Sequence, residues 1–291
     1  MEREQNTCAD LCSIATSVAD GGPVRCVGSW SYQKIYFLTQ YFGIFANGMK
    51  NKWDLHYIEL CSGPGRCVDR ECGVEMDGTA LAVLGHTAFE HLHSATFLDY
   101  NTNVVSALND RIMRRNLLSR AQAIKANYND TAGIAKIISR RVQKGLALVF
   151  IDPTDCSVPF ATVAAMAHIL PKVDFIINIA LGTDATRNIK PAILNANSKV
   201  REKYVSFLGS DAFFTDPEII RLAQTDQDKQ LRTKFRKHYR LSMKTLGYMH
   251  FEQERVKHYY ELLFASRHEQ GLIFWKGALK YKPDNQGTFD L

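Results

Sequence analysis

The sequence has no long hydrophobic run, and this absence excludes a membrane-spanning helix. No apolar stretch approaches the roughly 20 residues that cross a bilayer, and the N-terminal stretch MEREQNTCADLC lacks the charged and apolar regions of a signal peptide. The 291 residues are 46% hydrophobic and 23% charged, which provides enough apolar side chain for a large buried core. We therefore expect a globular cytoplasmic protein with no membrane contact.

The sequence also lacks the cysteine spacing of a zinc site. The seven cysteines are odd in number and irregularly spaced, and no two of them form a C-x2-C pair. The pair His91 and His93 is not on a recognisable ligand scaffold. We expect free thiols in a reducing compartment and no metal site. The cysteines are Cys8, Cys12, Cys26, Cys61, Cys67, Cys72 and Cys156.

Short apolar runs alternate with stretches of helical spacing in the first two thirds of the chain. The runs are apolar almost throughout, as in strands covered on both faces, and their alternation with helices predicts a parallel, doubly wound α/β sheet with helices on both faces. The predicted strands are 55–60, 95–99, 121–126, 146–151 and 173–180. The predicted helices are 30–47, 78–90, 102–117, 131–143 and 160–169.

The last third of the chain has a different pattern. Residues 184–246 are polar and mainly helical in spacing, residues 247–266 predict a hairpin of two strands, and residues 268–280 predict a closing helix. We therefore expect an N-terminal segment, one domain with a helical, basic insertion, and a C-terminal tail. Their ranges are 1–29, 30–280 with the insertion at about 184–246, and 281–291.

The stretch YIELCSGPGR at 57–66 indicates a ligand-binding turn. An apolar run ends at Glu59, and the chain then turns through Gly63 and Gly65. Glycines leave backbone N–H groups without side-chain cover at the carboxyl edge of the sheet, where α/β proteins bind nucleotides. The alternative is a structural turn, which a single G-x-G motif does not exclude.

The second predicted strand ends in Asp99, an acid able to take both hydroxyls of a ribose. Asp99 follows Gly65 by about 34 residues instead of roughly 20, and the long loop 66–77 accounts for most of the excess. The alternative role for Asp99 is to cap the helix that begins near Asn101.

Polar residues also follow the third and fourth predicted strands. Asn127 is placed to hydrogen-bond an adenine amino group and Tyr128 to stack on the ring; the alternative is a polar loop in which Asp130 caps the next helix. The fourth strand ends in Asp152, with Pro153 stiffening the turn. A carboxylate there accepts a proton or holds an amine, so Asp152 is the best catalytic candidate; the alternative is a turn-initiating aspartate.

A basic segment follows in the helical insertion. Its cations, with Phe235 and Tyr239 spaced to share one helix face, would bind a nucleic-acid backbone. The alternative is a solvated helix whose Leu231, Phe235, Tyr239 and Leu241 pack on the sheet. The cations are Lys229, Arg232, Lys234, Arg236, Lys237, Arg240 and Lys244.

Together these features resemble the bacterial three-Cys-motif partner protein family, whose sequences look like class I S-adenosylmethionine-dependent methyltransferases. The resemblance covers residues from about 32 to 278. Its marks are, in order, ELCSGPG, GTALAVL at 78–84, Asp99, DPTD and LLFASRHEQGLIFW. It implies a Rossmann-like, mostly parallel seven-stranded sheet whose last strand is antiparallel, and the hairpin at 247–266 suits that fold.

The resemblance implies S-adenosylmethionine as the cofactor and a role for each candidate residue. The turn glycines would admit the cofactor, Glu59 would orient its amino-acid end, and Asp99 would hold its ribose. Asn127 and Tyr128 would contact adenine. The cofactor candidates are Glu59, Cys61, Ser62, Gly63, Pro64, Gly65, Asp99, Tyr100, Asn127 and Tyr128, and the catalytic candidates are Asp152 and Asp155.

The sequence departs from the family pattern near both turns. Cys61 and Ser62 replace the usual Phe-Ala, and Asp155 stands where the family tends to have glycine. Because no aromatic residue follows Pro153, stacking on a flipped base is not expected.

The leading hypothesis is a methyltransferase or close relative, with nucleic acid as a candidate acceptor. The alternative is a non-catalytic accessory module of a radical-SAM-like three-Cys-motif protein or a phage-related partner. A metal-dependent nuclease is disfavoured because no carboxylate–histidine cluster has ligand spacing.

Overall fold

The computed structural model describes residues 15–280. Cys8, Cys12, the predicted tail 281–291 and the first part of the predicted segment 1–29 lie outside the described residues. The described chain divides into two compact units. The first unit comprises residues 15–125 and 273–280, and the second comprises residues 126–272.

Seven strands form one sheet in the order β6-β5-β2-β7-β8-β10-β9. The pairs β2–β5, β5–β6 and β7–β8 are parallel, whereas β10 runs antiparallel to both β8 and β9. This order confirms the predicted doubly wound, mostly parallel, methyltransferase-like α/β fold. The strands are β2 (Leu55–Leu60), β5 (Leu92–Asp99), β6 (Ala121–Lys125), β7 (Leu146–Ile151), β8 (Val173–Ile179), β9 (His250–Val256) and β10 (Tyr260–Ser266).

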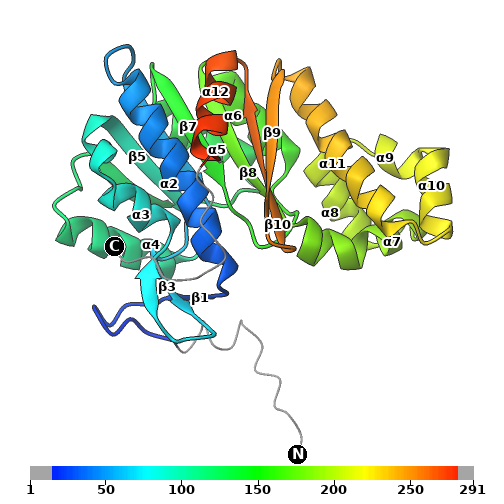
Figure 1. The fold of residues 1–291 in the computed structure, drawn as a ribbon, viewed down its shortest axis with the longest axis horizontal. Coiled ribbons are helices and arrows are strands. Elements are labelled where there is room, and N and C mark those ends of the chain that lie inside the picture. Colours follow the sequence, from blue (N-terminus) through cyan, green and yellow to red (C-terminus); the bar gives the residue numbers. More distant parts are fainter. Residues whose placement is uncertain (1–14, 281–291) are drawn as a thin grey trace, which may run out of the picture. The chain divides into compact units, whose positions relative to one another are not determined.

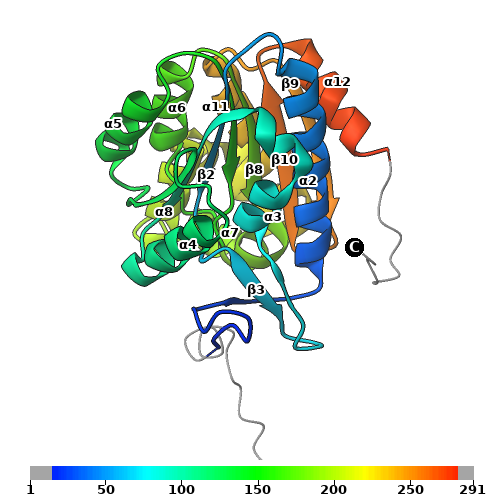
Figure 2. The ribbon, with the colours of Figure 1, turned by 90° about the vertical axis from the view of Figure 1, so that its left-hand side faces the viewer.

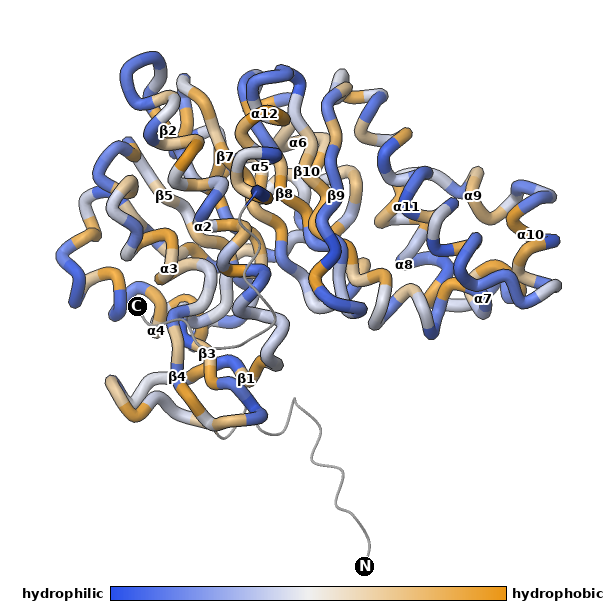
Figure 3. The backbone as a smooth tube through the Cα atoms, in the orientation of Figure 1, coloured by the Kyte–Doolittle hydropathy of each residue, from blue (hydrophilic) through white to orange (hydrophobic). Residues whose placement is uncertain are grey.

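The five predicted strands and the hairpin are confirmed, and the central strands of the sheet are buried over almost their whole length. Strand β2 is buried at all six positions, and strand β8 at all seven. In Figure 3, β8 is coloured hydrophobic over most of its length, while the helix α11 alternates between hydrophilic and hydrophobic residues. Continuous burial explains why these strands lack the in–out alternation of a half-exposed sheet.

Helices of the first unit cover its strands. Figure 2 shows α12 beside α2, and the ring of Tyr41 meets that of Trp275 edge to face at 5.6 Å. The predicted helix 78–90 is divided, because His86 is extended and caps the short 3₁₀ helix that follows. These elements are α2 (Trp30–Met49), α3 (Thr79–Gly85), η1 (Thr87–His91), α4 (Thr102–Arg114) and α12 (Glu269–Ala278).

The predicted long loop 66–77 is wrong, because it contains two strands. Strands β3 (Arg66–Asp69) and β4 (Glu75–Asp77) pair in antiparallel register, and β1 (Arg25–Val27) pairs in parallel with β3. Figure 1 shows this small sheet formed by segments that are far apart in the sequence. Each strand has only three or four residues and at least one charged end, so no apolar run reveals it.

The second unit contains the other helices, most of which lie in the segment between β8 and β9 (Figure 1). On α11, Leu231, Phe235, Tyr239 and Met243 recur every four residues and are buried. The prediction that Leu241 packs on the sheet is wrong. This residue is 48% exposed, because it follows the buried Tyr239 by two positions and therefore lies on the other side of the helix. The helices are α5 (Thr131–Arg141), α6 (Phe160–Ile169), η2 (Leu181–Ala185), α7 (Thr186–Leu194), α8 (Lys199–Leu208), α9 (Ala212–Thr215), α10 (Pro217–Gln224) and α11 (Asp228–Thr245).

Membrane crossing requires a helix that is both long and apolar. Among residues 15–280, no helix meets that requirement.

Candidate functional site

The turn after β2 adopts left-handed backbone conformations at three residues. Cys61 has φ 63°, Gly63 has φ 65° and Gly65 has φ 89°. A Cβ on Gly65 would lie 2.8 Å from Leu108 Cδ1 and 2.9 Å from Leu81 Cγ, so this glycine is required by helix packing. A Cβ on Gly63 would meet no atom closer than 3.6 Å. The nearest atoms to that position belong to the Arg25 guanidinium and lie at ordinary van der Waals distance, so Gly63 is favoured by its left-handed backbone and not by packing.

Asp99 is fixed against this turn. One carboxylate oxygen accepts the backbone N–H of Gly63 at 3.0 Å, and the other accepts that of Asn101 at 3.0 Å. The predicted alternative, that Asp99 caps the helix, is wrong, because the Asn101 side chain accepts from the first amides of α4. Each Asp99 oxygen keeps a lone pair for a ribose hydroxyl. Tyr100 beside it is 66% exposed.

Glu59 is fully buried and already engaged within the chain. Its two carboxylate oxygens accept hydrogen bonds from the hydroxyls of Tyr57, at 2.8 Å, and Thr79. Tyr57 was visible as a partner in the sequence, because residues two apart on a strand point to the same face. These contacts are a structural reason for an acid at this position.

Ser62 lies in the turn with only 7% of its surface exposed. Its backbone N–H donates to Leu98 O at 3.2 Å. Within residues 15–280, its hydroxyl has no hydrogen-bond partner. A buried hydroxyl without a partner costs free energy, which a ligand with a suitable acceptor would recover.

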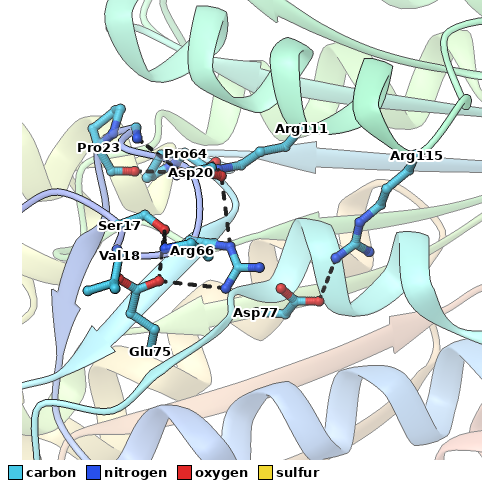
Figure 4. A network of polar contacts seen from close by, with 12 residues as sticks. Ser17, Val18, Asp20, Pro23, Pro64, Arg66, Glu75, Asp77, Arg111 and Arg115 are labelled. Atoms are coloured by element: carbon cyan, nitrogen blue, oxygen red, sulfur yellow. Dashed lines mark hydrogen bonds and ion pairs between the residues drawn. The ribbon is translucent and has the colours of Figure 1, made fainter.

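A polar network ties the glycine turn to the segment 17–23 (Figure 4). The Arg111 guanidinium binds both carboxylate oxygens of Asp20 at 2.7 Å and donates to Pro23 O at 2.9 Å and Pro64 O at 2.7 Å. The hydrogen bonds from Arg111 hold the pKa of the Asp20 carboxyl well below its usual range. Nothing in the local sequence indicates this contact, since Asp20 and Arg111 are 91 residues apart.

The same segment is also held by the small sheet. Glu75 accepts hydrogen bonds from the Ser17 hydroxyl, at 2.8 Å, and from the Val18 backbone N–H. Arg66 lies 3.7 Å from Glu75 in an ion pair (Figure 4). The segment 17–23 is therefore anchored on both sides.

A cavity of about 230 Å³ lies between this segment and α4. Its lining includes Asp20, Asp110, Arg111 and Arg114. Neither Gly63 nor Asp99 lines it, so it is separate from the contact between these two residues.

In the second unit, Asp152 follows the end of β7 and is 9% exposed. Its Oδ1 accepts from the Asn178 side-chain amide at 2.8 Å. Asn178 lies near the end of β8 and is 1% exposed. The pair is an acceptor group whose orientation is fixed by a neighbouring strand. Sequence reasoning missed Asn178, although a polar residue near the end of the otherwise apolar run VDFIINI was a signal.

Asp155 is drawn into an ion-pair cluster. Lys203 lies 3.2 Å from Asp155 and 2.8 Å from Asp184, and Asp184 also accepts the backbone N–H of Cys156 at 3.0 Å. These contacts stabilise the DPTD turn. They also occupy the second predicted catalytic carboxylate.

The predicted adenine contacts lie in a compact loop after β6. Asn127 Oδ1 accepts the N–H of Asn129 at 3.0 Å, and the Tyr128 hydroxyl lies 3.0 Å from that of Ser157. Asp130 caps α5 by accepting the N–H of Gly133 at 2.9 Å, which confirms that part of the alternative interpretation. The role of Asn127 and Tyr128 toward a ligand stays a prediction.

Several cations of α11 are engaged within the second unit. Lys234 pairs with Glu218 at 2.6 Å, and Arg236 with Glu261 at 2.7 Å. Phe235 shares its buried face with the other core residues of α11, so it does not reach a base. The other contacts are Arg232 with Thr186 at 2.8 Å and Arg240 over the Phe251 ring at 4.9 Å.

Comparison with known proteins gives similarity of fold. No protein-family model matches the chain, and no curated protein matches it. The O-methyltransferase from Bacillus cereus in complex with SAH (S-adenosylhomocysteine) is 13% identical, with 82% of this chain and 81% of that chain covered and a TM-score of 0.41. The SAH-bound Podospora anserina methyltransferase PaMTH1 is 9% identical, with 77% and 76% covered and a TM-score of 0.41.

Protein LPL1258 from Legionella pneumophila is 8% identical, with 88% of this chain and 95% of that chain covered and a TM-score of 0.49. At such scores we draw no conclusion about the site from these structures. The methyltransferase-like fold stands on the strand order of the sheet. Membership of the three-Cys-motif partner family stays a prediction.

Proposed function

We propose that the first unit binds S-adenosylmethionine at the turn after β2 and that the protein is a methyltransferase or a close relative. The observation that carries this proposal is the bond between Asp99 and the Gly63 amide. It joins a carboxylate suited to a ribose to a glycine turn, at the carboxyl ends of two neighbouring parallel strands.

The residues present fit such a cofactor. Gly63 adopts a left-handed backbone conformation without a side chain, and the lone pairs of Asp99 that remain accept hydroxyl protons. The buried Ser62 hydroxyl, without a partner among residues 15–280, supplies a donor. Glu59 supports the turn from within through Tyr57 and Thr79.

In the second unit, Asp152 is our candidate for the proton acceptor. When bound, S-adenosylmethionine supplies the methyl group, and its sulfur keeps the electron pair of the broken bond. Asp152 would take the proton that the methyl acceptor loses, with Asn178 holding the carboxylate in one orientation. Asp155 is less suited to this role, because Lys203 binds it.

Calorimetric titration of the full chain with S-adenosylmethionine and S-adenosylhomocysteine tests the proposal. We expect saturable binding that Asp99→Ala weakens by about 10- to 100-fold, since charge-assisted hydrogen bonds contribute about 1.5–3 kcal/mol. Glu90→Gln, at an acid that is 72% exposed, is the control and should leave binding unchanged. Absence of binding by folded protein would overturn the proposal.

The pairing of Asp155 with Lys203 favours a second candidate, a methyltransferase-like accessory module without turnover. The resemblance in sequence makes a radical-SAM-like three-Cys-motif protein the candidate partner. Cofactor binding with no methyl transfer, together with co-purification of that partner, supports this candidate. Methyl transfer that Asp152→Ala abolishes while cofactor binding persists excludes it.

We further propose a nucleic acid as the acceptor, bound through α11. Among residues 15–280, the side chains of Lys229, Lys237 and Lys244 form no ion pair, so they are available to phosphates. Fluorescence anisotropy with labelled single strands and duplexes should give a log–log salt slope of about −2 to −3 for three contacts. Replacing the three lysines by alanine should abolish this slope; binding that does not depend on them refutes the proposal.

A further inference from the structure

We propose that the turn of the β9–β10 hairpin stacks on an unpaired base of a single-stranded nucleic acid. This inference rests on the proposed function, and it names the form of the nucleic acid and the residues that hold its base. Helix α11 cannot supply the stacking ring, because Phe235 is fully buried and Tyr239 is 1% exposed. The helix offers cations for phosphates, so a ring for the base has to come from another element.

The hairpin places its turn at the edge of the sheet where Asp152 lies. Strand β10 runs antiparallel to β8, and Glu261 lies opposite Ile179, the last residue of β8. The turn residues 257–259 therefore project beyond the carboxyl end of β8. Asn178, next to that end, donates its hydrogen bond to Asp152 at 2.8 Å. The hairpin turn and the proposed proton acceptor thus share one edge of the sheet.

Two aromatic rings lie together in this turn. The ring centres of His258 and Tyr259 are 3.9 Å apart, and the ring planes meet at 36°. His258 is exposed and Tyr259 is half-buried. Lys257, which has a left-handed backbone with φ 49°, adds an exposed cation beside them. Aromatic rings next to a cation are the components of a surface on which bases stack.

The helix η2, which follows β8, fixes the turn from below. The Gly182 N–H donates to the Tyr259 carbonyl oxygen at 3.0 Å. A Cβ on Gly182 would collide with the His258 carbonyl oxygen, so the backbones of both ring-bearing residues lie against this glycine. Because the turn is held before a ligand arrives, less conformational entropy is lost on binding.

Helix α11 reaches the same part of the second unit. Arg236 pairs with Glu261 at 2.7 Å, next to the turn, and Arg232 donates to the hydroxyl of Thr186, the residue after η2, at 2.8 Å. Lys229 lies seven residues before Arg236, which is about 10 Å along the helix. A cationic helix end beside stacking rings suits a single strand, because only unpaired bases present a free face.

Fluorescence anisotropy with three labelled probes tests the inference. The probes are a single strand of about 12 nucleotides, its duplex, and a strand of equal length in which abasic sites replace the bases. We expect the single strand to bind about 10-fold tighter than the abasic strand, and tighter than the duplex. His258→Ala combined with Tyr259→Ala should weaken binding of the single strand by about 10-fold and leave the abasic strand unchanged.

Trp53→Ala is the matched control. Trp53 precedes β2 and is 41% exposed, so this substitution removes a larger ring from the surface and should affect no probe. Tyr259→Phe keeps the ring and should retain the affinity of the wild type. If the double substitution unfolds the protein, Tyr259→Leu replaces it, and the comparison of the single strand with the abasic strand needs no variant.

The outcomes separate the two proposals. If no probe binds to the wild-type chain, nucleic acid as the acceptor is wrong, and this inference fails with it. If the abasic strand binds as tightly as the single strand, or if the double substitution weakens both to the same extent or neither, the stacking turn is wrong while the lysines of α11 still bind phosphates. Tighter binding of the duplex than of the single strand also overturns the inference.

Discussion

Replacing Arg111 by methionine should release the segment 17–23 from the glycine turn. The Arg111 side chain is 5% exposed and makes two hydrogen bonds to Asp20 and two to backbone carbonyls. Removing one partner of a buried ion pair costs about 3–5 kcal/mol. Because the Asp20 side chain keeps 11% exposure and regains water when the segment lifts, we expect about 3 kcal/mol.

Amide hydrogen exchange followed by mass spectrometry measures this loss locally. The reporters are the amides of Ser17 and Gly21, which bond to Gly22 O at 2.7 Å and Ser17 O at 2.8 Å. A loss of about 3 kcal/mol in local opening free energy accelerates their exchange by roughly 100-fold.

The control is Arg115→Met, four residues later at the C-cap of α4. Arg115 pairs with Asp77 at 2.8 Å, but the two side chains are 30% and 34% exposed, so we expect less than about 1 kcal/mol. Equal exchange at Ser17 in the two variants, or unchanged exchange in Arg111→Met, would refute the reasoning.

Three further predictions concern the pH response and the backbone. The pKa of Asp20 is lower in the folded chain than its unfolded value of about 3.9, so its ion pair contributes fully above pH 4 and is lost as the pH falls. Urea unfolding at pH 7, 5 and 3 should show that the difference in free energy of unfolding between the wild type and Arg111→Met shrinks. In the same assay, Gly65→Ala should lower the free energy of unfolding by about 2–4 kcal/mol and Gly63→Ala by about 1 kcal/mol. Both substitutions strain a left-handed backbone, but only the first also adds a steric clash; equal losses would contradict this. Gly182→Ala should cost about 3 kcal/mol or more, since its Cβ would lie 1.6 Å from the His258 carbonyl oxygen; a stable variant would exclude that packing.

The large sheet was predictable because each central strand is a continuous apolar run. Strands 55–60 and 146–151 have the predicted bounds, and β8 ends one residue early. The small sheet was not predictable in this way. Its strands are stabilised by charged partners such as Arg66 and Glu75, and a short charged segment has the composition of a loop.

The residues of the candidate site likewise differ in whether the local sequence reveals their position. Gly63 and Asp99 follow strands that the sequence reveals, so their meeting at one sheet edge was expected. Arg25 and Arg111 reach the turn from elements whose position depends on long-range pairing. A side chain that arrives from 38 or more residues away leaves no trace in local spacing.

The motif Gly-Pro-Gly combines three requirements that its letters do not separate. Gly65 is glycine because Leu81 and Leu108 leave no room for a Cβ, which is a packing requirement. Pro64 offers its carbonyl to Arg111 and so anchors the segment that precedes β1. At Gly63 a Cβ would lie 3.6 Å or more from the Arg25 guanidinium, and Asp99 accepts the amide N–H. A structural turn and a ligand turn are therefore not mutually exclusive here, because the structural contacts of two residues hold the third beside the Asp99 carboxylate, where we propose that the ligand binds.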